Sequence, residues 1–184
     1  MEREKALNFL KENLSNINLQ KHCFAVEAIM RSLAEKFHED VEEWGIAGLL
    51  HDIDYEKTKE SPEKHSLIGA EMLEQAGLGE EITEAVKTHN EMHGIEPRSL
   101  MAKALFTADP ISGLIVAATL VSPSKKIQDL TVESVLKRFK EKSFARGANR
   151  EIIKKCENLL ELSLEEFTKI ALRAMQGISQ DIGL

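Results

Sequence analysis

Cysteine is scarce in this chain, which has only Cys23 and Cys156 among its 184 residues. Two cysteines are too few for the disulfide framework of a small secreted domain. Neither belongs to a Cys-x-x-Cys pair, the spacing that is typical of redox and zinc sites. We therefore interpret both cysteines as small buried hydrophobic residues.

Long hydrophobic runs are also missing from the sequence. The longest apolar stretch, residues 111–121, is interrupted by serine, glycine and threonine and is too short to span a bilayer. The N-terminus, Met-Glu-Arg-Glu-Lys, is charged and leads directly into a helical pattern, unlike a signal peptide. We therefore expect no membrane partner and a cytoplasmic location.

Aromatic residues and positive charge are both in short supply. Aromatic residues make up 5% of the chain, so no base-stacking platform can be assigned. The net charge of −7 disfavours binding to a nucleic acid backbone, and we expect no nucleic acid polymer as partner. Residues 122–155 are the exception, with ten basic and four acidic side chains. This segment is either a solvated helix face or a surface that attracts an anionic substrate.

Strand-like alternation and hairpin turns are absent over any useful length, whereas apolar residues recur at helical spacing along nearly the whole chain. The length and the 42% apolar content suit one domain with a sizeable core. We predict an all-α, single-domain helical bundle over 1–184, with a core at about 20–115 and a C-terminal helical extension at about 122–178. The predicted helices cover about 2–14, 19–37, 40–50, 61–76, 80–89, 99–121 with a kink at Pro110, 131–142, 148–160 and 163–176.

Histidine and aspartate, by contrast, form a pattern. All six histidines lie at or before position 93. His51 and Asp52 end an apolar run, residues 44–50, that we expect to be a central buried helix. A neutral imidazole beside a carboxylate supplies two ligands that suit a divalent metal. The His51-Asp52 dipeptide alone is weak evidence for a metal site, and its position at the end of a predicted buried helix strengthens this evidence.

Further candidate ligands lie on the inward faces of the neighbouring predicted helices. His22 and His89 each share a helix face with apolar residues, although a lone histidine there is more often a satisfied core residue. Asp109 ends an apolar stretch, and a buried carboxylate without a partner costs several kcal/mol. Together with His65, these residues predict a metal centre that hydrolyses phosphate esters.

The order His…His-Asp…His…His…Asp resembles the HD-domain metal-dependent phosphohydrolase superfamily, over about residues 20–115. Members of that superfamily are all-helical, in agreement with the helical pattern. The resemblance implies a first metal ion and a second one, with Asp52 bridging them. It assigns His22, His51, Asp52 and Asp109 to the first ion, and His65 and His89 to the second.

This sequence differs from the best-known motifs of the superfamily at two places, and the differences bear on which branch it resembles. Asp54 stands where the better-known form of the motif has glycine. Asn90 follows His89 and the chain has no Gly-Tyr-Pro, so the cyclic-dinucleotide phosphodiesterase branch is not favoured. The deoxynucleotidase branch uses one metal and needs neither His65 nor His89. Their presence favours two ions.

The ligand types suit Fe, Mn, Zn, Ni or Co and do not choose among them. A divalent transition metal lowers the pKa of bound water, which supplies hydroxide for in-line attack on phosphorus. Asp52 is a candidate for orienting this nucleophile as well as for ligation. His93, one turn after His89, is a candidate acid for the leaving group or an exposed turn residue.

Basic residues near the motifs are candidate substrate ligands. Lys57 and Lys64 flank the histidine motifs, and Lys142 and Arg146 belong to a turn that contains Gly147. For each of them, surface solvation is the alternative. Asp54 and Glu56 either hold ligating histidines in place or solvate a turn.

The leading hypothesis is a metal-dependent phosphohydrolase acting on a small phosphorylated molecule, by family analogy a nucleotide. Three alternatives stay open. They are a mononuclear nucleotidase, a catalytically silent module of the same fold that binds a nucleotide or a partner protein, and an iron-dependent oxygenase of related fold. The oligomeric state cannot be read from the sequence.

Overall fold

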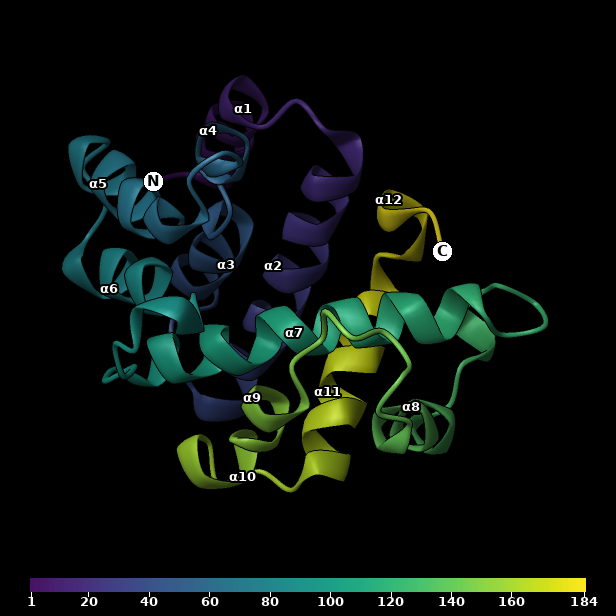
Figure 1. Ribbon diagram of the computed structural model, residues 1–184. Coiled ribbons are helices and arrows are strands. Elements are labelled where there is room, and N and C mark those ends of the chain that lie inside the picture. Colours follow the sequence, from purple (N-terminus) through teal and green to yellow (C-terminus); the bar gives the residue numbers. More distant parts are fainter.

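Two long helices, α2 (Ile17–Phe37) and α7 (Leu100–Leu120), pack against each other in the middle of the molecule, and the other helices surround them (Figure 1). The computed structural model describes residues 1–184 and contains helices and no strand, which confirms the predicted all-α fold. The remaining α-helices are α1 (Arg3–Asn13), α3 (Val41–Leu50), α4 (Tyr55–Thr58), α5 (Leu67–Gln75), α6 (Glu80–Thr88), α8 (Val132–Lys140), α9 (Arg150–Lys154), α10 (Cys156–Leu159), α11 (Leu164–Gly177) and α12 (Ser179–Ile182).

The central helix α3 begins where the sequence indicates. The Asp40 carboxylate accepts hydrogen bonds from the backbone N–H groups of Glu42 and Glu43, as an N-cap residue does. Every residue from 44 to 50 is buried, because α3 packs against α2, α1 and α6. This helix therefore delivers its last residues, and His51 after them, to the interior.

α7 is continuous through Pro110, which lies inside the helix. The apolar run 111–121 is therefore only the second half of a 21-residue helix. By length and composition α7 could cross a membrane, but 61% of its most apolar window is buried inside the fold. In this structure α7 is a core helix that places Asp109 3.0 Å from His22 of α2.

The prediction of one helix over 61–76 is wrong. Residues Pro62–Lys64 form a single 3₁₀ turn, His65 is extended, and α5 starts only at Leu67. Ser66 between them has a φ of 72°, an unfavourable value for a residue with a side chain. His65 therefore lies on a loop. The predicted helix over 148–160 is similarly divided, into α9 and α10.

One hydrophobic cluster of 43 buried residues extends from Ala6 to Ile182 and joins both parts of the chain. α11 packs on α2 and α7, while α8 and α9 pack on α7. The boundaries proposed for the core and the extension remain predictions. Both cysteines are buried and free, as predicted, and burial raises the pKa of the Cys156 thiol to about 12.

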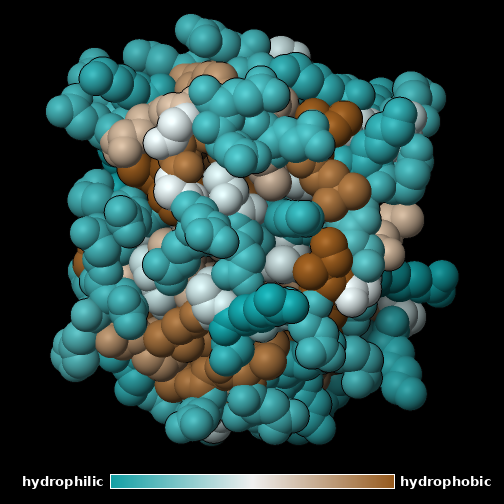
Figure 2. Space-filling view, turned by 90° about the vertical axis from the view of Figure 1, so that its left-hand side faces the viewer, coloured by the Kyte–Doolittle hydropathy of each residue, from teal (hydrophilic) through white to brown (hydrophobic).

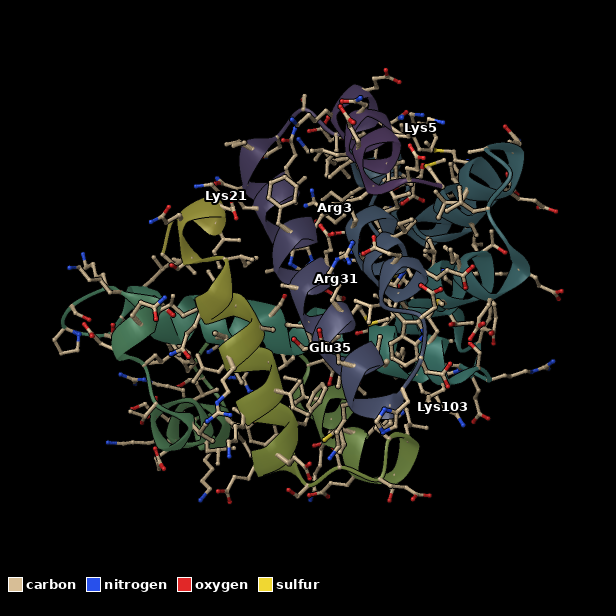
Figure 3. All side chains as sticks on the ribbon, turned by 180° about the vertical axis from the view of Figure 1, so that it is seen from behind. Arg3, Lys5, Lys21, Arg31, Glu35 and Lys103 are labelled. Atoms are coloured by element: carbon tan, nitrogen blue, oxygen red, sulfur yellow. The ribbon has the colours of Figure 1, made fainter.

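An ion-pair network around one buried carboxylate joins α1 to α2 on the side of the molecule seen in Figure 3, where Arg3 and Arg31 lie close together. Glu27 is 3% exposed and accepts from Arg3 at 2.6 Å and from Arg31 at 3.0 Å. Arg31 also pairs with Glu42 at 2.7 Å. This network satisfies the buried carboxylate of Glu27 with two arginines and includes none of the candidate metal ligands, so it serves the fold.

Hydrophilic side chains cover most of the face shown in Figure 2, and they divide the apolar residues there into separate patches. Large exposed apolar side chains are few and include Ile17, Met92, Leu120 and Val121. Scattered apolar residues of this kind are normal on a protein surface.

Candidate metal centre

The six residues predicted as metal ligands converge on one small volume. His22 comes from α2, Asp109 from α7, and His51 and Asp52 from the residues directly after α3. His65 comes from the loop before α5 and His89 from the residue after α6. Helix ends and helix faces from distant parts of the sequence therefore meet around Asp52.

Four ligand atoms lie on one side of this volume. His22 Nε2 is 3.2 Å from His51 Nε2 and 3.0 Å from Asp109 Oδ1. Asp52 Oδ2 lies 3.6 Å from His22 Nε2 and 3.5 Å from His51 Nε2. An ion bound at about 2.0–2.2 Å from each ligand needs such spacings between its ligands. Of these residues, His22, His51 and Asp109 lie close enough together to hold a metal ion.

The other oxygen of Asp52 faces the remaining histidines. Asp52 Oδ1 is 3.2 Å from His65 Nε2 and 3.5 Å from His89 Nε2. The two oxygens of one carboxylate thus face two different pairs of imidazoles. His51, Asp52 and His89 also lie close enough to share an ion.

Each of the four histidines has its other ring nitrogen fixed. The Nδ1 atoms of His51 and His89 lie 2.8 Å and 2.6 Å from the carbonyl oxygens of Gly48 and Val86. A carbonyl only accepts, so both Nδ1 atoms carry a proton, and in the neutral form of each ring Nε2 presents the lone pair that a metal ion needs. Ligating histidines are commonly oriented by such bonds.

The Nδ1 of His22 is fixed by Ser112. Ser112 Oγ donates to the Asp109 carbonyl at 2.7 Å, so it accepts from His22 Nδ1 at 3.2 Å. His22 Nε2 then lies 3.2 Å from His51 Nε2 and 3.0 Å from Asp109 Oδ1. Burial lowers the pKa of His22, but the hydrogen bond to Asp109 raises this pKa overall, so without a metal ion His22 Nε2 carries a proton that a bound ion would displace.

Asp54 fixes His65. Its buried carboxylate accepts from His65 Nδ1 at 2.9 Å and from the backbone N–H groups of Ser66 and Gly69 at 2.9 and 2.8 Å. A Cβ at Gly69 would lie 3.2 Å from the Asp54 carboxylate, so glycine permits this approach. The carboxylate at the position where the family motif often has glycine therefore holds a ligand loop.

The pKa values of His51 and His65 are shifted in opposite directions. Burial lowers the pKa of His51 to about 4, so its imidazole is neutral at pH 7. Burial acts in the same direction on His65, but its bonds to Asp52 and Asp54 outweigh burial and raise the pKa to about 10. In the absence of a metal ion, His65 therefore carries a proton, and a bound metal ion would displace that proton.

The acidic ligands stay ionised. Burial tends to raise the pKa of Asp52, yet the surrounding histidines hold this pKa well below its usual range. Burial has the same effect on Asp109, and the hydrogen bond from His22 lowers its pKa overall. Neutral imidazoles with ionised carboxylates are the donor set that divalent transition metals prefer, so the residues present fit such a group.

A cavity of about 320 Å³ adjoins the cluster. On one side it is lined by His22, His89 and Asp109, and on the other by the segment 145–149 and Ile152. His22 and Asp109 are the most exposed of the ligands, at 24% and 32%, whereas His51 is fully buried. A substrate would therefore reach the centre from the side of His22 and Asp109.

The basic residues proposed as substrate ligands do not line this cavity. Lys57 Nζ donates to Asn13 at the end of α1 and contacts Met72. Lys64, Lys142 and Arg146 are exposed. Their roles in substrate binding remain predictions.

His93 and Glu56 have defined structural partners. His93 Nε2 donates to the backbone carbonyl of His65 at 2.7 Å, which leaves only Nδ1 free for proton transfer, and its role as an acid stays a prediction. Glu56 accepts from the backbone N–H groups of Ser15 and Asn16, so it supports the start of α2.

Sequence reasoning missed Ser112 and the role of Arg150, although it singled out the turn around Gly147 that forms one wall of the cavity. Ser112 stands one helical turn after Asp109, a spacing that could have indicated contact with the same site. Arg150 donates to the backbone carbonyls of Phe144, Ala145 and Ala148 and so shapes the segment beside the cavity. No local signal in the sequence places that segment against α7.

Comparisons with known proteins agree with this geometry. The HD domain family model matches residues 19–114. Ribonuclease Y of Nitratidesulfovibrio vulgaris is 32% identical over 140 residues, which are 73% of this chain and 26% of that protein. Ribonuclease Y of Acidothermus cellulolyticus is 31% identical over 138 residues, 73% of this chain and 28% of that protein.

An uncharacterized protein of Methanocaldococcus jannaschii is 37% identical over 94 residues, which are 48% of this chain and 54% of that protein. The chain therefore spans between 26% and 28% of the two ribonuclease Y relatives and about half of the archaeal one. The family match covers more than half of the chain and contains all six candidate ligands. This protein belongs to the HD domain family.

Proposed function

We propose that this protein is a metal-dependent phosphohydrolase that holds two divalent transition-metal ions and cleaves the phosphate ester of a small molecule, such as a nucleotide. One observation carries the proposal. Four imidazoles have Nδ1 engaged and Nε2 directed at the ionised carboxylates of Asp52 and Asp109. Such an arrangement has no use in packing a core.

When bound, the ions would lower the pKa of a coordinated water and neutralise the charge of the phosphate. The chain's own residues perform the positioning. Asp52 presents one oxygen to each pair of histidines and lies at the midpoint of the cluster, while His51 at its buried side excludes solvent. The cavity beside His22 and Asp109 leaves room for the substrate.

Binding of the substrate phosphate then depends on the two proposed metal ions, because the cavity lining holds no lysine or arginine side chain. Its polar residues outside the ligand set are Glu91 and Asn149, which are hydrogen-bonded to each other at 3.3 Å. These two groups suit hydroxyl or amino groups of the organic part of a substrate better than they suit phosphate.

The test begins with protein purified without chelator. Metal content is measured, and hydrolysis is assayed on a panel of phosphomonoesters and phosphodiesters, for the wild type, His51→Ala and Asp52→Ala. The matched control is His38→Asn, because His38 is exposed at the left-handed C-cap of α2, a conformation that asparagine tolerates. We expect loss of metal and activity in the first two variants only. Unchanged metal and activity in both would overturn the proposal.

The name of the ribonuclease Y relatives favours RNA as a second candidate substrate. A metal-loaded sample that cleaves a single-stranded oligoribonucleotide faster than it hydrolyses any 5′-mononucleotide would support that alternative. A mononuclear nucleotidase would instead hold one ion per chain and keep its activity in His65→Ala. A silent binding module would bind ligand without turnover of any ester.

A further inference from the structure

The cavity beside the metal-ligand cluster has one wall made by a single face of α7. Phe106, Asp109, Pro110 and Gly113 all line it. Their spacing of three, one and three residues places them on one helical face. Asp109 reaches into the ligand cluster. Gly113 lies one helical turn after Asp109 on the same face of α7 and also lines the cavity.

The backbone conformation at position 113 does not require a glycine. It lies inside α7 and has an ordinary φ, and a Cβ built on it would meet no atom within 4 Å. Glycine inside a helix costs about 0.5–1 kcal/mol relative to alanine. A side chain at this position would enter open space next to Asp109, so its absence keeps the cavity wide.

The opposite wall comes from the C-terminal part of the chain, where the green segment between α8 and α9 crosses α7 in Figure 1. It contributes Ala145, Gly147, Ala148 and Asn149, and a Cβ at Gly147 would also meet nothing within 4 Å. The guanidinium of Arg150 holds this segment by donating to three of its carbonyls.

Small residues therefore line the facing segment, and Gly113 is the one small residue of the α7 wall, while ligands of both proposed ions also line the cavity. Its volume of about 320 Å³ is at the lower limit of small-molecule sites, which have about 300–1,000 Å³. Phe106 supplies an apolar surface, and the Glu91 carboxylate supplies an acceptor, while the Asn149 amide donates to Glu91 and caps the start of α9. This lining suits an uncharged organic group that carries hydroxyl or amino donors.

We propose that Gly113 determines substrate size, because it keeps open a subsite between α7 and segment 145–149 for a leaving group as large as one nucleoside. This inference rests on the proposed function, since the phosphate must lie at the metal-ligand cluster for its organic group to reach Gly113. Gly113 acts by leaving space, and Arg150 is a positioning residue for the facing wall.

The test compares Gly113→Leu with Gly113→Ala, in the full chain loaded with Mn²⁺. Calorimetry gives the Kd of a 5′-nucleoside monophosphate and of inorganic phosphate, and kinetics give KM for the nucleotide and for glycerol phosphate. We expect Gly113→Leu to weaken nucleotide binding and raise its KM by about tenfold or more. The Kd of inorganic phosphate, the KM of glycerol phosphate and the metal content should stay within about twofold of the wild-type values.

Gly177→Leu is the matched control. Gly177 ends α11, is exposed, and also has open space around a built Cβ, but it does not line the cavity. We expect wild-type binding from it, and an intermediate effect from Gly113→Ala. Equal nucleotide affinity in wild type and Gly113→Leu, with metal retained, would overturn the inference. So would an equal loss for nucleotide and inorganic phosphate.

The calorimetric comparison separates this inference from the proposed function. Should the wild type hydrolyse no ester, the proposed function fails, while nucleotide binding that depends on residue 113 would still support the subsite. Should the wild type hydrolyse esters with the same KM in Gly113→Leu, the subsite fails and the proposed function stands. Binding of an oligoribonucleotide that Gly113→Leu leaves unchanged also counts against the subsite.

Discussion

Asp52 divides the proposed metal ligands into two halves, and different contacts hold these halves in place. The first half is His22, His51 and Asp109, and the second is His65 and His89. His22, His51 and Asp109 belong to α2, to the end of α3 and to α7, which pack directly on one another. His65 belongs to a loop whose next residue, Ser66, has a φ of 72°. Its position depends on three hydrogen bonds to one carboxylate, that of Asp54. Helix packing fixes the first half and also His89, which follows α6, whereas one buried side chain fixes His65.

This difference means that the halves can be separated experimentally. Only Asp52 belongs to both, because its Oδ2 faces His22 and His51 while its Oδ1 faces His65 and His89. A change at Asp52 should affect both halves, a change at Asp54 the second and a change at Ser112 the first.

The largest effect is expected from Asp52→Ala. Both proposed ions lose a ligand, so we expect less than one ion per chain and a fall in kcat/KM of at least about 10³-fold. Metal analysis together with hydrolysis of the best ester from the panel measures both. A variant that keeps two ions would show that Asp52 does not bridge.

Asp54→Asn should weaken the second ion alone. Residues that orient a ligand typically change metal affinity by about 10–100-fold. Calorimetric titration with Mn²⁺ should therefore show one site near its wild-type affinity and one weakened by that factor. Equal weakening of both sites would remove the distinction between the halves.

Ser112→Ala provides the reciprocal case. It deletes the hydroxyl that accepts from His22 Nδ1, so only the first ion should bind more weakly, by about tenfold. Ser134→Ala is a suitable control, because Ser134 is an exposed residue near the start of α8 and far along the sequence from every ligand. A weakened second ion in Ser112→Ala would contradict the assignment.

The halves also differ in their response to pH. The pKa of His51 is lowered to about 4, so metal-free protein loses stability as pH falls from about 6.5 to 4, where unfolding lets His51 gain a proton. The pKa of His65 is raised to about 10, so its stabilising charge is fully present below about 6.5 and is lost as pH rises through 10.

Chemical denaturation of chelator-treated protein should therefore give maximal stability near neutral pH. Mn²⁺-loaded protein should lack the loss on the alkaline side, because the ion replaces the proton of His65. His65→Ala should reduce that loss in the metal-free profile, and the remainder comes from His22, whose pKa is lowered by burial but raised overall by its hydrogen bond to Asp109. An alkaline loss that persists unchanged in His65→Ala would show that another group causes it.

The smallest effect is expected from Lys57→Ala. Lys57 donates to Asn13 on the surface, so its removal should change the free energy of unfolding by less than about 0.5 kcal/mol and leave KM unchanged. Denaturant titration and steady-state kinetics measure the two quantities. A raised KM would restore Lys57 as a substrate ligand.

The helical fold and the six converging residues could be predicted from the sequence, because helical periodicity and the order of histidine and aspartate are local or ordered signals. The path of the chain at His65 could not. Ser61 and Pro62 are a standard helix start, but the three donors that Asp54 collects from residues 65–69 outweigh this local preference.

The cavity could not be predicted for a different reason. Its walls come from α7 and from residues more than thirty positions later, and only tertiary packing brings them together. The direction of Lys57 likewise depends on where α1 lies. Glycine at position 113 carries no meaning in the sequence until the facing segment is known.

The most direct test of the shared role of Asp52 is anomalous diffraction from crystals loaded with Mn²⁺. Two anomalous peaks are expected, one between Asp52 Oδ2, His22, His51 and Asp109, and one between Asp52 Oδ1, His65 and His89. A single peak on either side, or peaks that Asp52 does not contact, would contradict a centre of two ions joined by this carboxylate.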